Sequence, residues 1–178
     1  MPINDTMPPN PDPHALDQAT LARVRQVFQQ ARSGDADALE ALLAQGLPPN
    51  LCNERGDSLL MLACYHGHPD AARVLLEHGA DPALMNDAGQ APLHGAAFKG
   101  DLAVATLLLD HGARADHAGP NGKTALMFAA MFNRVEIARL LLERGADPRV
   151  LDAGGIGLVE AARRMGAGDT AALLAAYT

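Results

Sequence analysis

The chain has 178 residues, 48% of them hydrophobic, and a formal net charge of −7 at pH 7. This length fits one domain, and its core has to be built from leucine and alanine, because the chain has no tryptophan and only four phenylalanines and two tyrosines. The acidic balance argues against nucleic acid as a partner, since the phosphate backbone is bound by basic surfaces.

Residues 1–15 contain five prolines. Proline disrupts helix interiors, so we expect a disordered, proline-rich tail over residues 1–15, followed by one helical domain over residues 16–178. The tail has neither a basic start nor an apolar run, so it is not a secretory signal. No apolar run approaches the ~20 residues of a membrane span. We therefore expect a cytoplasmic protein with no membrane partner.

The sequence after the tail repeats with a fixed period. Glycines recur every 33 residues at Gly56, Gly89, Gly122 and Gly155, and similar apolar segments follow the first three. A second pattern, Leu-Leu-x-x-Gly-Ala-Asp-Pro, occupies residues 75–82 and returns at residues 141–148. A period of this length is typical of stacked solenoids, which work by presenting a surface.

Each unit is predicted to contain a turn, two short helices and a return loop. In the second unit, Ser58 is suited to cap a helix that runs to about His66, and the next helix spans about Pro69–Glu77. Thr124 is suited to the same capping role in the fourth unit. A residue tolerant of positive φ should end each first helix. These residues are Gly34, Gly67, Gly100, Asn133 and Gly166.

The apolar pattern predicts how the units pack. Small residues recur on the first helices at Ala63, Ala96, Ala129 and Ala162, while leucines dominate the second helices. Small side chains let neighbouring helices approach closely, and no single unit can bury its leucine face alone, so stacking is obligatory.

These motifs resemble the ankyrin-repeat family. Residues 91–96, Ala-Pro-Leu-His-Gly-Ala, are similar to that family's Thr-Pro-Leu-His-x-Ala motif, although Met61 and Met127 replace the histidine in the units on either side. The resemblance implies an all-α solenoid of helix-turn-helix units with hairpin-like loops. We expect five helix pairs, the outer two acting as caps. The approximate units are residues 16–50, 51–84, 85–117, 118–150 and 151–178.

By this resemblance, the first helices line a concave face on which an unidentified protein partner binds. Three of the six aromatic residues fall on this face at successive units, where aromatic and methionine side chains are typical of binding surfaces. The expected concave positions are Tyr65, His66, Phe98, Lys99, Met131, Phe132, Arg164 and Met165. The expected contributors from the turn tips are Glu54, Arg55, Asp57, Asp87, Gln90, Asn121 and Lys123.

Other interpretations of this pattern remain open. The three aromatic side chains can instead pack on one another and stabilise the array, and each tip residue alone is typical of a solvated turn. The protein can scaffold a partner, act as an adaptor, or inhibit one by occlusion. A different function is that of an accessory factor for an oxidative-stress or haem enzyme. We expect a monomer, although the alanine-rich segment Thr170–Tyr177 leaves self-association open.

Catalysis, metals and cofactors are not expected. The sequence contains no nucleophile elbow, no phosphate-binding glycine loop and no zinc helix motif. His66, His68 and His78 lack the acidic or cysteine residues of a metal site. Cys52 and Cys64 are interpreted as free thiols, with Cys64 buried at a position that holds alanine in the next two units.

Overall fold

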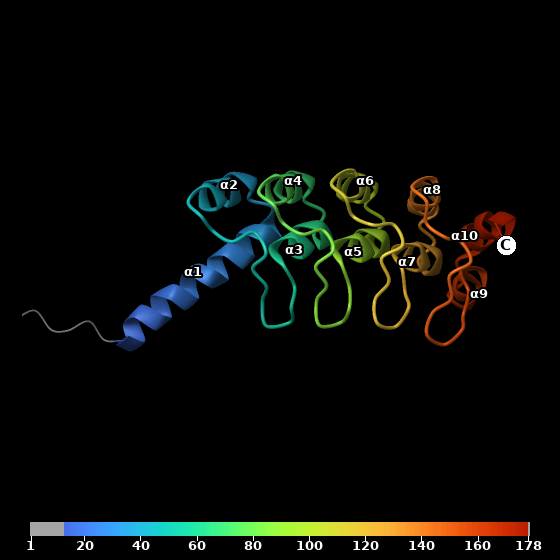
Figure 1. The fold of residues 1–178 in the computed structure, drawn as a ribbon, viewed down its shortest axis with the longest axis horizontal. Coiled ribbons are helices and arrows are strands. Elements are labelled where there is room, and N and C mark those ends of the chain that lie inside the picture. The colour runs from blue at the N-terminus through green and yellow to red at the C-terminus, as the bar shows by residue number, and fades with distance from the viewer. Residues whose placement is uncertain (1–12, 178) are drawn as a thin grey trace, which may run out of the picture.

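The computed structural model describes the backbone of residues 13–177 and the side chains of residues 18–177. Over this range the chain forms five successive helix pairs and a terminal 3-10 turn (Figure 1), which confirms the predicted all-α solenoid. The pairs are α1 (Pro13–Ser33) with α2 (Ala36–Ala44), α3 (Leu59–Tyr65) with α4 (Pro69–Glu77), α5 (Pro92–Lys99) with α6 (Leu102–Asp110), α7 (Ala125–Met131) with α8 (Val135–Glu143), and α9 (Leu158–Arg164) with α10 (Gly168–Leu174), the turn being η1 (Ala175–Tyr177).

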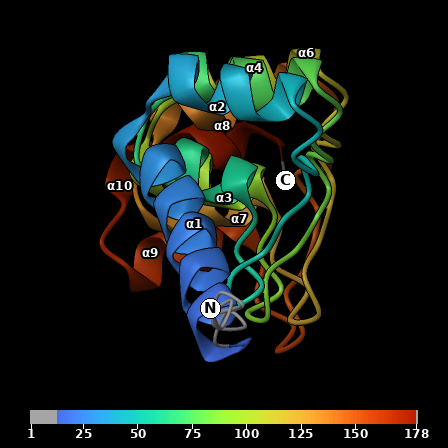
Figure 2. The same ribbon diagram turned by 90° about the vertical axis from the view of Figure 1, so that its left-hand side faces the viewer.

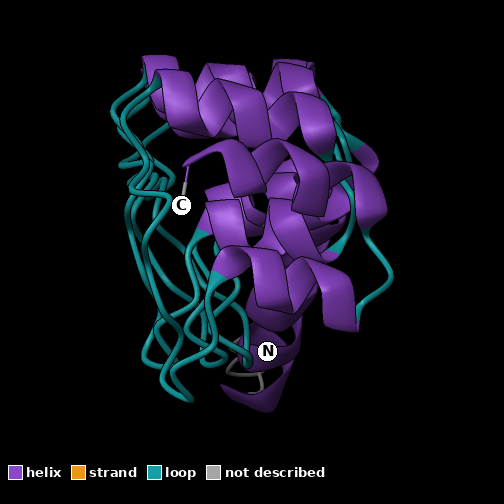
Figure 3. Cartoon of the chain, turned by 90° about the vertical axis from the view of Figure 1, so that its right-hand side faces the viewer, coloured by secondary structure: helices purple, strands orange, loops and turns teal. Residues whose placement is uncertain are grey.

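The helices lie in two rows. The first helix of each pair packs against the first helix of the next, from α1 through α3, α5 and α7 to α9, and we name this row the inner row. The second helices, α2, α4, α6, α8 and α10, form the outer row on the other side of the core. A long loop precedes each inner helix from α3 to α9. Figure 3 shows most of the loop chain gathered along one side of the two rows.

The first helix begins earlier than the sequence predicted. The tail was expected to extend to residue 15, but α1 starts at Pro13, because a proline is accepted in the first turn of a helix. The expected disorder of residues 1–12 lies outside the described residues. Figures 1 and 2 show that α1 runs from the inner row toward the level of the loop tips. The first unit therefore contributes a long helix beside the loops, as well as a cap.

The predicted caps fix the ends of the inner helices. The side chains of Ser58 and Thr124 accept hydrogen bonds from the backbone N–H groups of Met61 and Met127, at 3.0 and 3.3 Å. At the other end, Asn133 adopts φ +56°, the left-handed conformation that glycine takes in the other units. Both ends of α3 and α7 are thus set by local chemistry, and each of these helices has 7 residues.

The core follows the predicted packing pattern. Ala63, Ala96, Ala129 and Ala162 are completely buried where consecutive inner helices meet. The leucines of the outer row fill the space between pairs, and Leu75, Leu108 and Leu141 are also completely buried. Because each layer buries its apolar face only against the next layer, stability rests on contacts between neighbouring units.

The loops are held together by bonds between units. At the tips, the N–H of Asp87 donates to the carbonyl of Arg55, and the N–H of Ala153 donates to the carbonyl of Asn121. The matching position between these two junctions is Pro120, which has no N–H to donate. We name this row of backbone hydrogen bonds between neighbouring tips the tip ladder. It is interrupted at Pro120, in the middle of the array.

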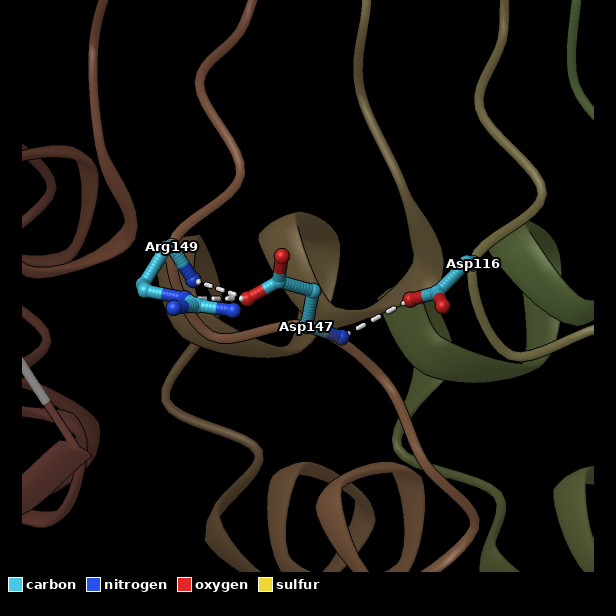
Figure 4. Close-up of polar contacts among 3 residues, drawn as sticks. All are labelled: Asp116, Asp147 and Arg149. Atoms are coloured by element: carbon cyan, nitrogen blue, oxygen red, sulfur yellow. Dashed lines mark hydrogen bonds and ion pairs between the residues drawn. The ribbon is translucent and has the colours of Figure 1, made fainter.

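The return loops carry a second set of bonds. The carboxylate of Asp116 accepts a 2.8 Å hydrogen bond from the N–H of Asp147 in the next unit (Figure 4). The Asp147 carboxylate accepts in turn from the backbone and side chain of Arg149, and these bonds lower the pKa of Asp147. Asp116 thus links two units, while Asp147 orders its own turn; at an earlier junction the side chain of Asn50 links to the N–H of Asp81 in the same way.

The last helix pair is tied to the array by Thr170. Its buried hydroxyl donates to the carbonyl of Ala130 at 2.7 Å, and its N–H donates to the side chain of Asn133 at 3.1 Å. Thr170→Val keeps the shape of the side chain but leaves the buried carbonyl short of a donor. We expect a loss of about 1–2 kcal/mol in the free energy of unfolding, measured by urea denaturation.

Thr106→Val is the control for this substitution. The Thr106 hydroxyl bonds to the Leu102 carbonyl of its own helix at 2.8 Å, in an exposed position. Water replaces that bond when it is lost, so we expect a change within about 0.5 kcal/mol. Equal losses for the two variants would show that Thr170 does not fasten the last unit.

Candidate functional site

A groove of about 1010 Å³ runs along the inner row. Its floor is formed by α3, α5 and α7, one side by the loop tips over residues 53–57 and 86–90, and the other side by the N-terminal helix α1. α1 can form a wall of the groove because it continues past the inner row toward the loop tips, as Figure 2 shows. The groove is therefore bounded by α1 at the N-terminal end of the solenoid, and no residue of α9 or α10 lines it.

An aromatic ladder lies on the floor of the groove. Tyr65 and Phe98 stack nearly parallel, with ring centroids 6.3 Å apart, and Phe98 meets Phe132 edge to face at 4.5 Å. The structure thus brings the three predicted aromatic side chains into one continuous row. They also pack on one another, as the competing interpretation required, and a ring pair of this kind adds about 0.5–1.5 kcal/mol. Tyr65 nevertheless remains 40% exposed.

Polar groups flank the ladder at its N-terminal end. The ammonium of Lys99 lies 4.8 Å from the centroid of the Tyr65 ring, at a distance typical of a cation–π contact. The ring of His66 meets Tyr65 edge to face at 5.5 Å. Burial, assisted by the nearby cations, lowers the pKa of His66, which favours its neutral form. Met131, on α7, lines the groove near the other end of the ladder.

The predicted concave residues of the last unit lie outside the groove. Arg164 forms an ion pair with Glu160 of its own helix at 2.6 Å, and Met165 is exposed at the end of α9. Neither residue lines the groove. The groove instead spans the first four helix pairs.

The predicted tip residues fall into two groups. Glu54, Arg55, Asp57 and Gln90 line the groove. Asp57 is not a free solvated residue, because its carboxylate accepts hydrogen bonds from the side chains of Asn53 at 3.2 Å and Asn86 at 2.8 Å. It therefore holds two neighbouring tips together. The tip residues outside the groove lining are Asp87, Asn121 and Lys123.

Sequence reasoning missed the contribution of α1. Leu21 and Val24 are 53% and 40% exposed, and together with Phe28 they line the groove. Their spacing of three and four residues places them on one face of the helix. This apolar stripe on an otherwise polar helix is the sequence signal for a binding role of α1, in addition to the cap predicted from the sequence.

Comparison with known proteins agrees with this architecture. The sequence model of ankyrin repeats (3 copies) matches residues 27–118 and, in an overlapping placement, residues 79–152, which together make up more than half of the chain. The chain is an ankyrin-repeat protein. It is also 62% identical over 53 residues to a protein of Pseudomonas aeruginosa whose name describes it as an ankyrin repeat protein. That match covers 30% of this chain and 31% of the relative, so the chain spans about a third of the protein it matches.

The ankyrin motif histidine is present once, at His94 in the middle of the groove region. Nδ1 of His94 accepts the backbone N–H of Ala91 at 2.9 Å, and the Nε2–H group donates to the carbonyl of His117 at 2.8 Å. Ala91 has no side-chain oxygen and cannot cap α5 as Ser58 and Thr124 cap their helices. His94 instead holds the start of α5 by accepting the N–H of Ala91 itself, a different backbone group. Burial lowers the pKa of His94 below its ordinary value of 6.5, and the bond to His117 opposes this shift.

His94→Met tests this role, because methionine stands at the matching positions Met61 and Met127. Loss of both bonds leaves a buried N–H and a carbonyl unpaired, so the free energy of unfolding should fall by about 1–3 kcal/mol. In the wild type the native state binds fewer protons than the unfolded chain, so stability should fall as the pH drops below 6.5 and His94 protonates. The variant should show a flatter dependence of melting temperature on pH.

The double variant Ala91→Thr with His94→Met reproduces the residue pair found at Thr124 and Met127. It should recover stability near neutral pH without restoring the acid dependence. If His94→Met melts as the wild type does at pH 7, the histidine does not hold the start of α5.

Three other histidines have hydrogen-bond partners within the fold. His68 Nε2 donates to the carbonyl of Arg32 at 2.9 Å, and the Nδ1 atoms of His78 and His111 lie 2.9 Å from carbonyls of their own helices. In the described part of the chain, histidine, cysteine and acidic side chains form no group of three or more that suits a metal ion. Across the same residues, no helix has the length and apolar character needed to cross a bilayer.

The two cysteines differ in environment. Cys64 is completely buried, as predicted, and burial raises the pKa of its thiol. Cys52 is exposed at the base of the first loop, where partial burial and the nearby carboxylates of Asp57 and Asp87 also raise its pKa. Both thiols therefore favour the protonated, less nucleophilic form.

Proposed function

We propose that this ankyrin-repeat protein binds a partner protein in the groove between α1, the inner row and the loop tips. Ankyrin repeats are protein–protein interaction modules and form a non-catalytic fold. The observation that carries the proposal is the aromatic ladder of Tyr65, Phe98 and Phe132 on the groove floor. By filling the groove, a partner would be scaffolded, recruited or inhibited.

The packing of the ladder supports binding as well as stability. Rings that already contact one another lose little side-chain freedom when a partner covers them, and such preorganisation lowers the entropic cost of association. Tyr65 keeps 40% of its surface exposed, and Leu21 and Val24 face the same groove. A contiguous exposed apolar surface of this kind is typical of a contact site.

A photo-crosslinking experiment tests the proposal. Benzoyl-phenylalanine is placed at His66, which lines the groove, and at Arg73, an exposed position on α4 in the outer row. Each protein is produced in the organism that encodes the chain, irradiated and analysed by mass spectrometry. We expect crosslinked species of defined mass from position 66 that do not form from position 73.

The outer-row position serves as the control for random collision. Identical products from positions 66 and 73 would show that the groove is not selective. Products from position 73 alone would move the binding surface to the outer row, and either result would overturn the proposal.

A further inference from the structure

The two rows of helices carry charge of opposite sign. The inner-row helices contain six basic and two acidic residues, whereas the outer-row helices contain two basic and eight acidic residues. The chain as a whole has a net charge of −7, so the inner row is reversed in sign relative to the protein around it. The basic residues of the inner row are Arg23, Arg25, Arg32, Lys99, Arg163 and Arg164.

The cations near the groove have no ion-pair partner among the described side chains. Arg25, Arg32 and Arg55 line the groove, and Lys99 lies against Tyr65 at its edge. Among residues 18–177, none of these four takes part in a salt bridge. Their charge is therefore available to a ligand.

Acidic residues in the groove do not cancel this charge. Only Glu54 and Asp57 supply carboxylates to the described lining, against three arginines. Asp57 keeps its charge, because its partners Asn53 and Asn86 are neutral amides. The lining therefore retains one net positive charge, to which Lys99 adds at the edge. Acids of the outer row, by contrast, meet cations between units, as Asp110 does with Arg144 at 2.8 Å. The groove thus has an excess of positive charge, and the outer row has an excess of negative charge.

Apolar surface lies directly beside these cations. Leu21 and Val24 precede Arg25 on α1 and line the groove with it. The partly exposed ring of Tyr65 lies on the groove floor. An occupant that covers this surface has to place large apolar side chains on the ladder and on α1 while its carboxylates meet the arginines. A purely acidic segment would leave the apolar surface exposed to water. A neutral apolar segment would bury the arginines without a charged partner.

Resting on the proposed function, we propose that the groove takes a segment of a partner protein in which aspartate or glutamate alternates with large apolar side chains. Complementary charge of this kind raises the rate of association and fixes the orientation of the segment, while the apolar contacts supply most of the affinity. The acidic outer row keeps the rest of the molecule from attracting the same ligand.

Selection from a displayed random-peptide library tests this partner chemistry. The library is panned separately against the full wild-type chain and against a variant carrying Tyr65→Ala, Phe98→Ala and Phe132→Ala. We expect peptides that only the wild type enriches, with Asp or Glu and Leu, Ile or Phe over-represented. A synthetic peptide of the most enriched sequence then serves as the probe for titration.

Charge variants separate the electrostatic claim from the apolar one. Arg25→Gln with Arg55→Gln should weaken the probe about tenfold, since two exposed ion pairs with the ligand are lost. Arg73→Gln with Arg139→Gln on the outer row should leave its affinity unchanged. Rising NaCl concentration should weaken binding to the wild type, because screening acts on exposed charges.

The outcomes distinguish this inference from the function on which it rests. If the wild type enriches no more than the aromatic variant, the groove is not a binding surface and both proposals fail. If enriched peptides depend on the aromatic residues but are neutral or basic, the groove binds and the acidic partner is wrong. If the chain assembles with itself as concentration rises and the probe blocks this, the occupant is a second copy of the chain, which also overturns the inference.

Discussion

Gly122→Val should lower the free energy of unfolding by about 3 kcal/mol or more, because two costs coincide at this turn. Gly122 has φ +73°, a conformation in which a β-branched residue is strained. A Cβ at this position would also lie 2.9 Å from the backbone nitrogen of Ala153 in the next tip. That nitrogen donates the tip-ladder bond to Asn121, so the substitution should break it as well. The melting temperature should fall by roughly 6–12 °C.

Gly155→Val separates the two costs. Gly155 has φ +77° at the matching position of the last tip, but nothing lies within 4 Å of a Cβ built there. It should lose only the conformational term, about 1–3 kcal/mol. Equal melting temperatures for the two variants would show that the contact between tips contributes nothing.

The triple variant Tyr65→Ala, Phe98→Ala and Phe132→Ala should weaken the partner by at least about a hundredfold. Aromatic residues at the centre of an interface commonly account for 2 kcal/mol or more each. Its stability should fall less, by about 1–3 kcal/mol, since two ring pairs are lost from a half-buried surface. Binding is measured by titration with the partner that photo-crosslinking identifies, and stability is measured by urea denaturation.

Leu102→Ala is the control for loss of exposed apolar surface. Leu102 is 40% exposed, as is Tyr65, but it lies on α6 in the outer row and outside the groove. Its removal should leave affinity unchanged. A triple variant that binds as tightly as the wild type, or one that no longer folds, would favour packing as the role of the ladder.

The sequence predicts the fold well because the repeat carries its own local rules. Ser58, Thr124 and Asn133 specify helix ends through interactions with their own turns, and a fixed period shows how these turns stack. The bounds of α4, Pro69–Glu77, follow from the proline that begins it and the Leu-Leu-x-x-Gly pattern that ends it.

The site is harder to predict, because it depends on contacts between units. The alignment of Tyr65, Phe98 and Phe132 follows from their shared position in the repeat, but the N-terminal extension of α1 has no counterpart in the other units. Its reach past the inner row, and with it the role of Leu21 and Val24, comes from a helix of 21 residues, whereas the other α-helices have 7 to 9. Likewise, Asp57 binds Asn86 across two tips, an interaction that neither turn reveals alone.

Methionine methyl groups report most directly on whether the groove is the binding surface. Met61 and Met131 line the groove, whereas Met85 and Met165 do not. The ¹³C-methyl-labelled protein is titrated with the partner that photo-crosslinking identifies. In its NMR spectra the signals of Met61 and Met131 should shift, while those of Met85 and Met165 stay in place. Shifts confined to Met85 or Met165, with Met61 and Met131 unchanged, would contradict the account.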